Sequence, residues 1–202
     1  MIYHTNCMRT LTNQRALDFL KLYHIPTMDY TPILGAHLIR NFPCVFKVDS
    51  PKILHKAEHK VVHVVHHKDH AESKFHALRK KGNVISQRHV DGHEFVIQVF
   101  RPPRGKMLIL LGIGGIPTDV HEHFSVRPCP VALGSARKMI DELRASEYIT
   151  TFSGKKTKVS SLEKTIVALS KLALKENVKA IEIDPFILNH KFGGVADAKI
   201  VA

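Results

Sequence analysis

Carboxylates near the end of the sequence have the spacing of a divalent-cation site. Glu182 and Asp184 lie two residues apart in an apolar stretch, so a strand would direct both to one side. Asp197 lies within a second apolar stretch, residues 195–200, where an unpaired carboxylate would be costly to bury. Two strands that direct carboxylates to one point can hold Mg²⁺ together with nucleotide phosphates. The alternative is a surface hairpin with solvated acids, and the pattern favours the metal site.

Lys47 is a candidate phosphate ligand because it interrupts an apolar strand. The other residues of the segment 44–48 are cysteine, valine and phenylalanine. A charged amine at this position could bind phosphate at the mouth of a cleft. It could equally belong to an edge strand and extend its long side chain to water. The strand alone leaves both interpretations open.

A glycine-rich segment follows the most continuous apolar strand. Gly112, Gly114 and Gly115 lie within residues 111–116. Glycine lets the backbone approach a ligand closely and adopt positive φ, and the backbone N–H groups of such a turn can hold phosphate. The alternative is a bulged turn without a ligand.

His55 is flanked by Lys52 and Lys56. An imidazole beside lysines can be kept neutral and can accept a phosphoryl group. The alternative is that His55 belongs to a solvated, histidine-rich surface, because nine of the 15 histidines fall between His55 and His93.

A zinc site is a further possibility in this region. His55, His59 and His63 are spaced by four residues, which would place them on one face of a helix. The valine pairs at 61–62 and 64–65 favour a strand instead, and a strand would separate the three side chains.

Hydrophobic periodicity predicts a mixture of helices and strands without an internal repeat. Helices are expected at residues 12–23, 71–81, 135–145 and 160–176, and strands at residues 43–48, 61–65, 94–100, 107–111, 180–183, 185–188 and 195–201. Thr12 can cap the first helix, and Ser160 with Glu163 has the spacing of a capping box. The turn at residues 101–105 should join its two flanking strands into an antiparallel pair.

The composition favours a protein that binds polyanions. The 202 residues carry a formal charge of +12, with 30 Lys and Arg against 18 Asp and Glu. Aromatic residues make up only 7% and tryptophan is absent, so a platform for stacking nucleic-acid bases is not expected. The three scattered cysteines, the polar start and the lack of a long apolar run predict a soluble cytoplasmic protein without a membrane segment.

Taken in order, these segments resemble a known family. The resemblance is to the ATP-grasp region of the NDP-forming acyl-CoA synthetases, which are related to the succinyl-CoA synthetase β subunit. It covers about residues 13–202, and it is carried by the segments 42–48, 50–56, 112–116, 181–186 and 195–199.

The resemblance implies an α+β ATP-grasp fold, in which two lobes grip a nucleotide. Residues 1–84 would form an N-terminal helix and a shortened front lobe, and residues 85–202 would form the C-terminal lobe. The implied cofactors are Mg²⁺ and ATP or ADP. The implied reaction converts acyl-CoA, ADP and phosphate into acid, ATP and CoA, and it requires an α-type partner subunit that carries the CoA-binding and ligase domains.

The resemblance also assigns roles to single residues. His55 would be the mobile histidine that carries phosphate, and Asp184 and Asp197 would hold Mg²⁺. Nucleotide-binding roles fall on Lys47, Gln87, Gly112, Gly114, Gly115 and Arg127, and Asp119 matches an acidic position beyond the glycine turn.

The sequence departs from the family in several places. The front lobe is shortened around residues 32–41 and 70–81. The Gly-Gly-Val loop that usually follows the His-Lys pair is replaced by residues 57–62, which contain no glycine. Arg88 stands where the family usually has an acidic residue near the adenine, and Asp184 stands where it usually has Asn. The alternatives to a catalytic subunit are therefore a non-catalytic ATP-grasp module that binds or regulates a partner, and a histidine-rich metal-binding protein.

Overall fold

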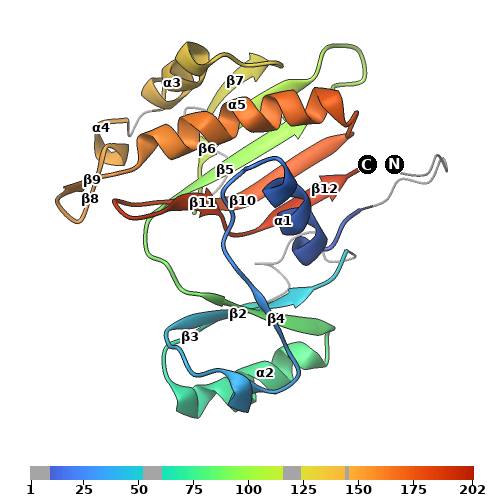
Figure 1. Ribbon diagram of the computed structural model, residues 1–202, viewed down its shortest axis with the longest axis vertical. Coiled ribbons are helices and arrows are strands. Elements are labelled where there is room, and N and C mark those ends of the chain that lie inside the picture. Colours follow the sequence, from blue (N-terminus) through green and yellow to red (C-terminus); the bar gives the residue numbers. More distant parts are fainter. Residues whose placement is uncertain (1–9, 52–60, 116–123, 144–145) are drawn as a thin grey trace.

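The computed structural model describes residues 10–51, 61–115, 124–143 and 146–202, and it has an α+β architecture (Figure 1). A six-stranded sheet and a four-stranded sheet each pack against helices, and a two-stranded hairpin lies beside the larger sheet. Helices α5 (Val159–Lys175) and α3 (Leu133–Asp141) pack on the larger sheet, and α2 (Ala71–Arg79) packs on the smaller one. The expected α+β class is confirmed.

The larger sheet is antiparallel throughout, in the order β11-β10-β5-β6-β7, and β12 pairs with the first half of β10. Its strands are β5 (His93–Phe100), β6 (Leu108–Ile113), β7 (Phe124–Pro128), β10 (Ala180–Leu188), β11 (Gly193–Val195) and β12 (Ala198–Val201). The predicted pairing of residues 94–100 with residues 107–111 is confirmed as β5 and β6.

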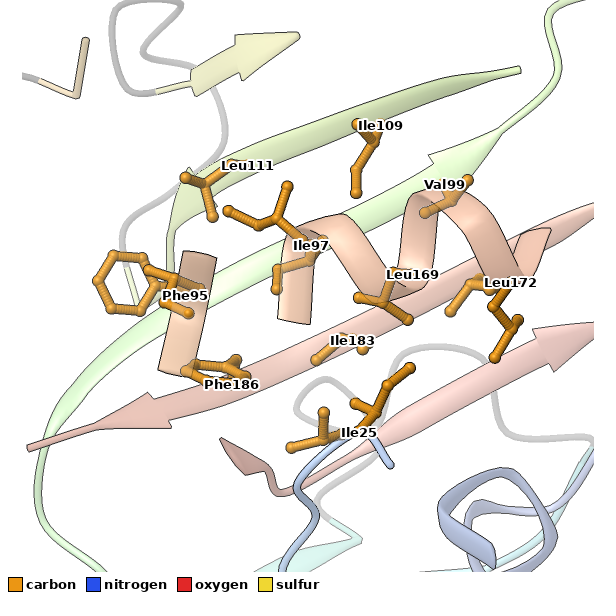
Figure 2. Close-up of a cluster of buried hydrophobic side chains, with 14 of the residues drawn as sticks. Ile25, Phe95, Ile97, Val99, Ile109, Leu111, Leu169, Leu172, Ile183 and Phe186 are labelled. Atoms are coloured by element: carbon orange, nitrogen blue, oxygen red, sulfur yellow. The ribbon is translucent and has the colours of Figure 1, made fainter. Parts of the chain in front are cut away.

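The core of the larger sheet follows from strand alternation. Phe95, Ile97 and Val99 of β5 are fully buried, while the residues between them are less so. They pack with the apolar stripe of α5, which includes Leu169 and Leu172, as Figure 2 shows. The predicted capping box is wrong: Lys158 is the N-cap residue of α5, and Glu163 accepts a hydrogen bond from Arg137 of α3 at 3.2 Å.

The smaller sheet has the order β1-β4-β2-β3 and its own core. Its strands are β1 (Thr31–Ile33), β4 (Asn83–Arg88), β2 (Cys44–Asp49) and β3 (Val62–Val65). Cys44, Phe46 and Val48 belong to the core beneath α2, so alternation directs Val45 and Lys47 to the opposite face.

Helix α1 (Asn13–Leu22) belongs by packing to the larger sheet. Ala16, Leu17 and Leu20 are fully buried in its core, and Thr12 caps the helix by accepting a hydrogen bond from the Arg15 backbone N–H at 3.4 Å, as predicted. The division of the chain between residues 84 and 85 stays a prediction. Strand β4 crosses that point, and its whole length pairs with β2.

The last two predicted strand regions differ from the structure. Residues 180–183 and 185–188 form one strand, β10, with a register irregularity between Ile183 and Phe186. The predicted strand 195–201 is instead broken, because Ala196 and Asp197 separate β11 from β12. At the break the Ala196 N–H donates to the Pro185 carbonyl (3.0 Å), and the Asp184 N–H donates to the Asp197 carbonyl (3.2 Å).

Most of the elements that the periodicity did not predict are short or lie at an edge. They are the strands β1 and β7, the helices η1 (Ala36–Leu38), η2 (Lys68–His70) and α4 (Ser146–Ile149), and the hairpin of β8 (Thr151–Phe152) and β9 (Lys155–Lys156). Strand β4, which lies between β1 and β2 inside the smaller sheet, was also not predicted from periodicity. Across the described ranges, no helix combines the length and apolar character that a membrane span needs.

Leu169→Ala should destabilise the protein by about 2–5 kcal/mol, because it removes a fully buried side chain between α5 and the sheet. Leu174→Ala is the matched control in the same helix. Its side chain is 39% exposed, so the loss should be about 1 kcal/mol or less. Chemical unfolding followed by circular dichroism measures both, and equal losses would contradict the packing of α5.

Candidate functional site

A cleft of about 450 Å³ lies between the two sheets and is lined by side chains from both. Val45, Lys47 and Gln87 come from the smaller sheet. The larger sheet contributes Glu94 from β5, Glu182 and Asp184 from β10, and Asp197 from the connection between β11 and β12. The cleft therefore brings together Lys47, Gln87, Asp184 and Asp197, four residues that the sequence had separated by up to 150 positions.

Lys47 and Asp197 form an ion pair across the cleft, with Nζ 3.6 Å from Oδ2. The same Nζ donates a hydrogen bond to the Ala196 carbonyl at 3.1 Å. Lys47 is 5% exposed and Asp197 9%, so both charges are largely removed from water. Such charges must be paired to be tolerated, and the pair joins β2 of one sheet to the β11–β12 connection of the other.

Asn13, the first residue of α1, contacts the same carboxylate. Its Oδ1 accepts a hydrogen bond from the Ala198 N–H at 3.0 Å, and its Nδ2 lies 3.5 Å from Asp197 Oδ2. Asn13 also lines the cleft. Sequence reasoning missed this residue, because an asparagine after a helix-capping threonine carries no signal of a distant partner.

Asp184 faces a surplus of negative charge in the cleft. Desolvation raises its pKa first, and the neighbouring carboxylates of Glu182, Asp197 and Glu94 raise that pKa further, while Lys47 lowers it. Glu94 is a second residue that sequence reasoning missed, since its position on the cleft depends on how β5 and β10 pair.

This donor set fits a divalent cation. Carboxylate oxygens are the ligands that Mg²⁺ prefers, and a cation would relieve the repulsion that raises the pKa of Asp184. Among the residues that the structure describes, no three His, Cys, Asp or Glu side chains already have the geometry of a metal site. Phosphate oxygens and water must then complete the coordination, as is usual for Mg²⁺ bound with a nucleotide.

Gln87 lines the cleft and has a buried side-chain amide. The residue is 3% exposed, and neither its Oε1 nor its Nε2 finds a hydrogen-bond partner in the described part of the chain. A buried amide left unpaired costs about 1–3 kcal/mol. Gln87 pairs in register with Val45, two residues along β2 from Lys47, so the unsatisfied amide and the ammonium group line the same cleft.

Two of the three predicted glycines line a second, smaller cavity of about 290 Å³, which shares Glu94 with the main cleft. Gly114 and Gly115 line it, whereas Gly112 is paired within β6 and lines neither cavity. The Gly114 N–H donates to the Glu94 carbonyl at 2.7 Å, and a Cβ on Gly114 would lie 3.1 Å from Glu94 backbone and side-chain atoms. Gly115 has φ of +74°, a conformation that favours glycine.

Arg127 lies on β7 and lines neither cavity. Its guanidinium forms an ion pair with Glu142 at the C-terminal end of α3 and also donates to Ser125 at 3.3 Å. Hydrogen bonds from Ser125 and Arg127 lower the pKa of Glu142. The contacts of Arg127 therefore connect β7 with α3.

His55 and Asp119 lie outside the described residues. Ser50 and Pro51 line the cleft, so the chain leaves β2 at the cleft wall just before the segment that contains His55. His63 lies on β3, where desolvation and then Lys74 and Lys81 lower its pKa.

Comparison with known proteins identifies similar chains. The sequence matches the ATP-grasp domain family over residues 4–202. The β subunit of the ADP-forming acetate–CoA ligase I of Pyrococcus furiosus is 25% identical over 213 residues, which cover 96% of this chain and 92% of that protein.

Two solved structures of the dinucleotide-forming acetyl-coenzyme A synthetase 1 of Ca. Korarchaeum cryptofilum share the fold. The complex with coenzyme A, Ca-AMPCP and HgCl⁺ has a TM-score of 0.84 and 21% identity, and the match covers 96% of this chain and 93% of that one. The complex with coenzyme A and Mg-AMPPCP, whose phosphohistidine segment points towards the nucleotide site, has a TM-score of 0.79 and 22% identity, with 95% and 92% covered. The expected ATP-grasp fold is confirmed.

Asp184→Asn should stabilise the metal-free protein at neutral pH. A carboxyl group whose pKa rises on folding binds its proton more tightly in the folded state, so stability falls as the pH rises from the ordinary pKa through the folded one. Asparagine has no such charge. The gain over wild type should be present at pH 7 and should disappear below the ordinary pKa of 3.8, where both states are protonated.

The measurement is the thermal midpoint in EDTA across this pH range. Asp69→Asn is the control, because Asp69 is exposed and lines neither cavity. A gain that persists at the lowest pH, or an equal gain for Asp69→Asn, would contradict the proposed repulsion in the cleft.

Proposed function

We propose that this chain, which belongs to the ATP-grasp family, is the Mg-nucleotide-binding subunit of an ADP-forming acyl-CoA synthetase. Together with a CoA-binding partner it would convert acyl-CoA, ADP and phosphate into carboxylic acid, ATP and CoA. The P. furiosus relative is named as one subunit of such a ligase, and 92% of its length is covered here, which supports a subunit of the same kind.

The observation that carries the proposal is the combination of groups in one cleft. The Gln87 amide is buried with no hydrogen-bond partner among the described residues, and it can donate and accept hydrogen bonds at a nucleobase. Lys47 and the carboxylates of Asp184 and Asp197 line the same cleft, where an ammonium group and a cation can bind phosphates. A nucleotide with bound Mg²⁺ matches both requirements.

Each residue then has a defined task. Lys47 would turn its ammonium group from the Ala196 carbonyl and Asp197 to a phosphate oxygen. Asp184 and Asp197 would hold Mg²⁺, which when bound neutralises phosphate charge and orients the terminal phosphate. Catalysis in such a site rests on positioning and on electrostatic neutralisation rather than on covalent chemistry by these residues.

His55 would carry the phosphoryl group to the nucleotide. In the ATP-forming direction, the phosphorus–nitrogen bond of the phosphohistidine breaks as a terminal phosphate oxygen of ADP forms the new phosphorus–oxygen bond. The K. cryptofilum structure is described with a phosphohistidine segment directed to its nucleotide site, and here Ser50 and Pro51 place the start of the corresponding segment at the cleft wall. These points support the assignment of His55.

Asp197→Asn should weaken the binding of Mg-ADP, measured by calorimetry, by about tenfold or more, because one oxygen ligand loses its charge. Binding in EDTA should change less. Asp69→Asn is again the matched control on the surface. Equal Mg-ADP affinity in wild type and Asp197→Asn would remove Asp197 from the metal site.

His55→Ala should abolish turnover by the complex of this chain with its CoA-binding partner, while His59→Ala should leave it near the wild-type rate. Only His55 lies between the two lysines of the segment that resembles the family. The assay follows labelled phosphate from ATP in the full complex and in the isolated chain, which should not form acyl-CoA.

The outcomes separate the candidate functions. Equal activity in wild type, His55→Ala and His59→Ala would end the relay role of His55. Nucleotide binding without any turnover in the complex would favour the non-catalytic module suggested by the missing glycines at residues 57–62.

A further inference from the structure

We infer that Asn13 is a positioning residue for Asp197 and thereby helps to set the Mg²⁺ dependence of nucleotide binding. The inference rests on the proposed function, since it concerns the same cation site. Asn13 would not touch the cation or the nucleotide phosphates. It would act by holding the Asp197 carboxylate in one orientation.

The orientation of the Asn13 amide follows from its backbone partner. The Ala198 N–H can only donate, so the amide atom that it contacts at 3.0 Å must be the oxygen. The NH₂ end of the same amide must then be the atom that lies 3.5 Å from Asp197 Oδ2. A donor therefore faces the carboxylate, and one amide group fixes both the backbone beside Asp197 and its side chain.

The helix holds Asn13 in place. Asn13 is 3% exposed, and Ala16, Leu17 and Leu20 anchor α1 in the core of the larger sheet. Helix α1 also packs against β12, which begins directly after Asp197. The amide has little freedom to leave the carboxylate, as is required of a group that orients a metal ligand.

Asn13 and Lys47 both approach Oδ2 of Asp197, but they differ in charge and in the sheet to which they belong. Lys47 comes from the smaller sheet, and in the proposed function its ammonium group moves to a phosphate. Asn13 is neutral and is anchored to the larger sheet, so it keeps its hold on Asp197 when Lys47 leaves. Because it adds no positive charge, it orients the carboxylate without reducing its attraction for a cation.

Asn13→Ala tests the inference by calorimetry of ADP binding, with Mg²⁺ and with EDTA. The gain in affinity that Mg²⁺ provides should fall by about tenfold or more, the usual effect of losing a group that orients a metal ligand. The affinity for ADP in EDTA should stay within about twofold of the wild-type value, because the substitution leaves the nucleotide contacts in place. Arg15→Ala, an exposed position of the same helix, is the control and should leave both affinities unchanged.

Two further variants keep the result decisive. Asn13→Leu keeps the branched four-atom skeleton of the Asn side chain without its hydrogen-bonding groups, and it serves if Asn13→Ala does not fold. In the Asp197→Asn background, Asn13→Ala should cause no further loss of the Mg²⁺-dependent gain, because the residue through which it acts has already been changed.

The outcomes are distinguishable from failure of the proposed function. Wild-type protein without Mg²⁺-dependent ADP binding would overturn both ideas. Wild-type protein that binds Mg-ADP, with the Mg²⁺-dependent gain unchanged in Asn13→Ala and Asn13→Leu, would overturn the positioning role alone. Equal losses with Mg²⁺ and with EDTA would show that Asn13 merely supports the fold, and would also overturn it.

Discussion

The ion pair between Lys47 and Asp197 is the interaction on which the candidate site depends. It connects β2 of the smaller sheet with the β11–β12 connection of the larger one, and both residues are largely buried. Removing two charges from water costs free energy that their attraction repays only when further hydrogen bonds are present. The Ala196 carbonyl and the Asn13 amide supply such bonds, so the pair is held by groups that are themselves fixed.

The charge of the cleft opposes the charge of the protein as a whole. The chain carries a formal charge of +12, which attracts polyanions, yet the lining of the cleft places the four carboxylates of Glu94, Glu182, Asp184 and Asp197 beside the three cations of Lys47, Arg88 and Lys199. A free nucleotide would meet repulsion from these carboxylates, whereas a nucleotide that brings Mg²⁺ would relieve it. In the proposed function the carboxylates would favour the metal complex of the ligand. The pKa of Asp184, which desolvation raises first and Glu182, Asp197 and Glu94 raise further, reflects the same environment.

Local patterns in the sequence predicted the long elements well. Helix α1, the pair of β5 and β6 and the apolar stripe of α5 follow from periodicity and capping, which act within a few residues. The break at Ala196 and Asp197 was missed because hydrogen bonds to Pro185 and Asp184, about a dozen residues earlier in the chain, determine it. Asn13 and Glu94 were missed for a related reason. The packing of α1 and the pairing of β5 with β10 determine which residues lie beside them in the cleft. These long-range contacts cannot be predicted from local sequence patterns.

The polar groups of the cleft are divided between the two sheets. The two sheets have separate principal cores, and a third, small apolar cluster contains Met28 and Ile187. Across the cleft, Lys47 of the smaller sheet contacts Asp197 and the Ala196 carbonyl on the side of the larger one. Asn13, Asp184 and Asp197 all belong to the side of the larger sheet, while Lys47 and Gln87 belong to the smaller one.

A nucleotide would replace the contact between Lys47 and Asp197 with two contacts, one from phosphate to lysine and one through the cation to aspartate. It would also satisfy the Gln87 amide, which gains no partner from protein within the described residues. In the proposed function, binding would favour the closed arrangement of the two sheets to the extent that the new contacts are stronger than the ones they replace. The proposed cation ligands, Asp184 and Asp197, would remain in place while the smaller sheet adjusts.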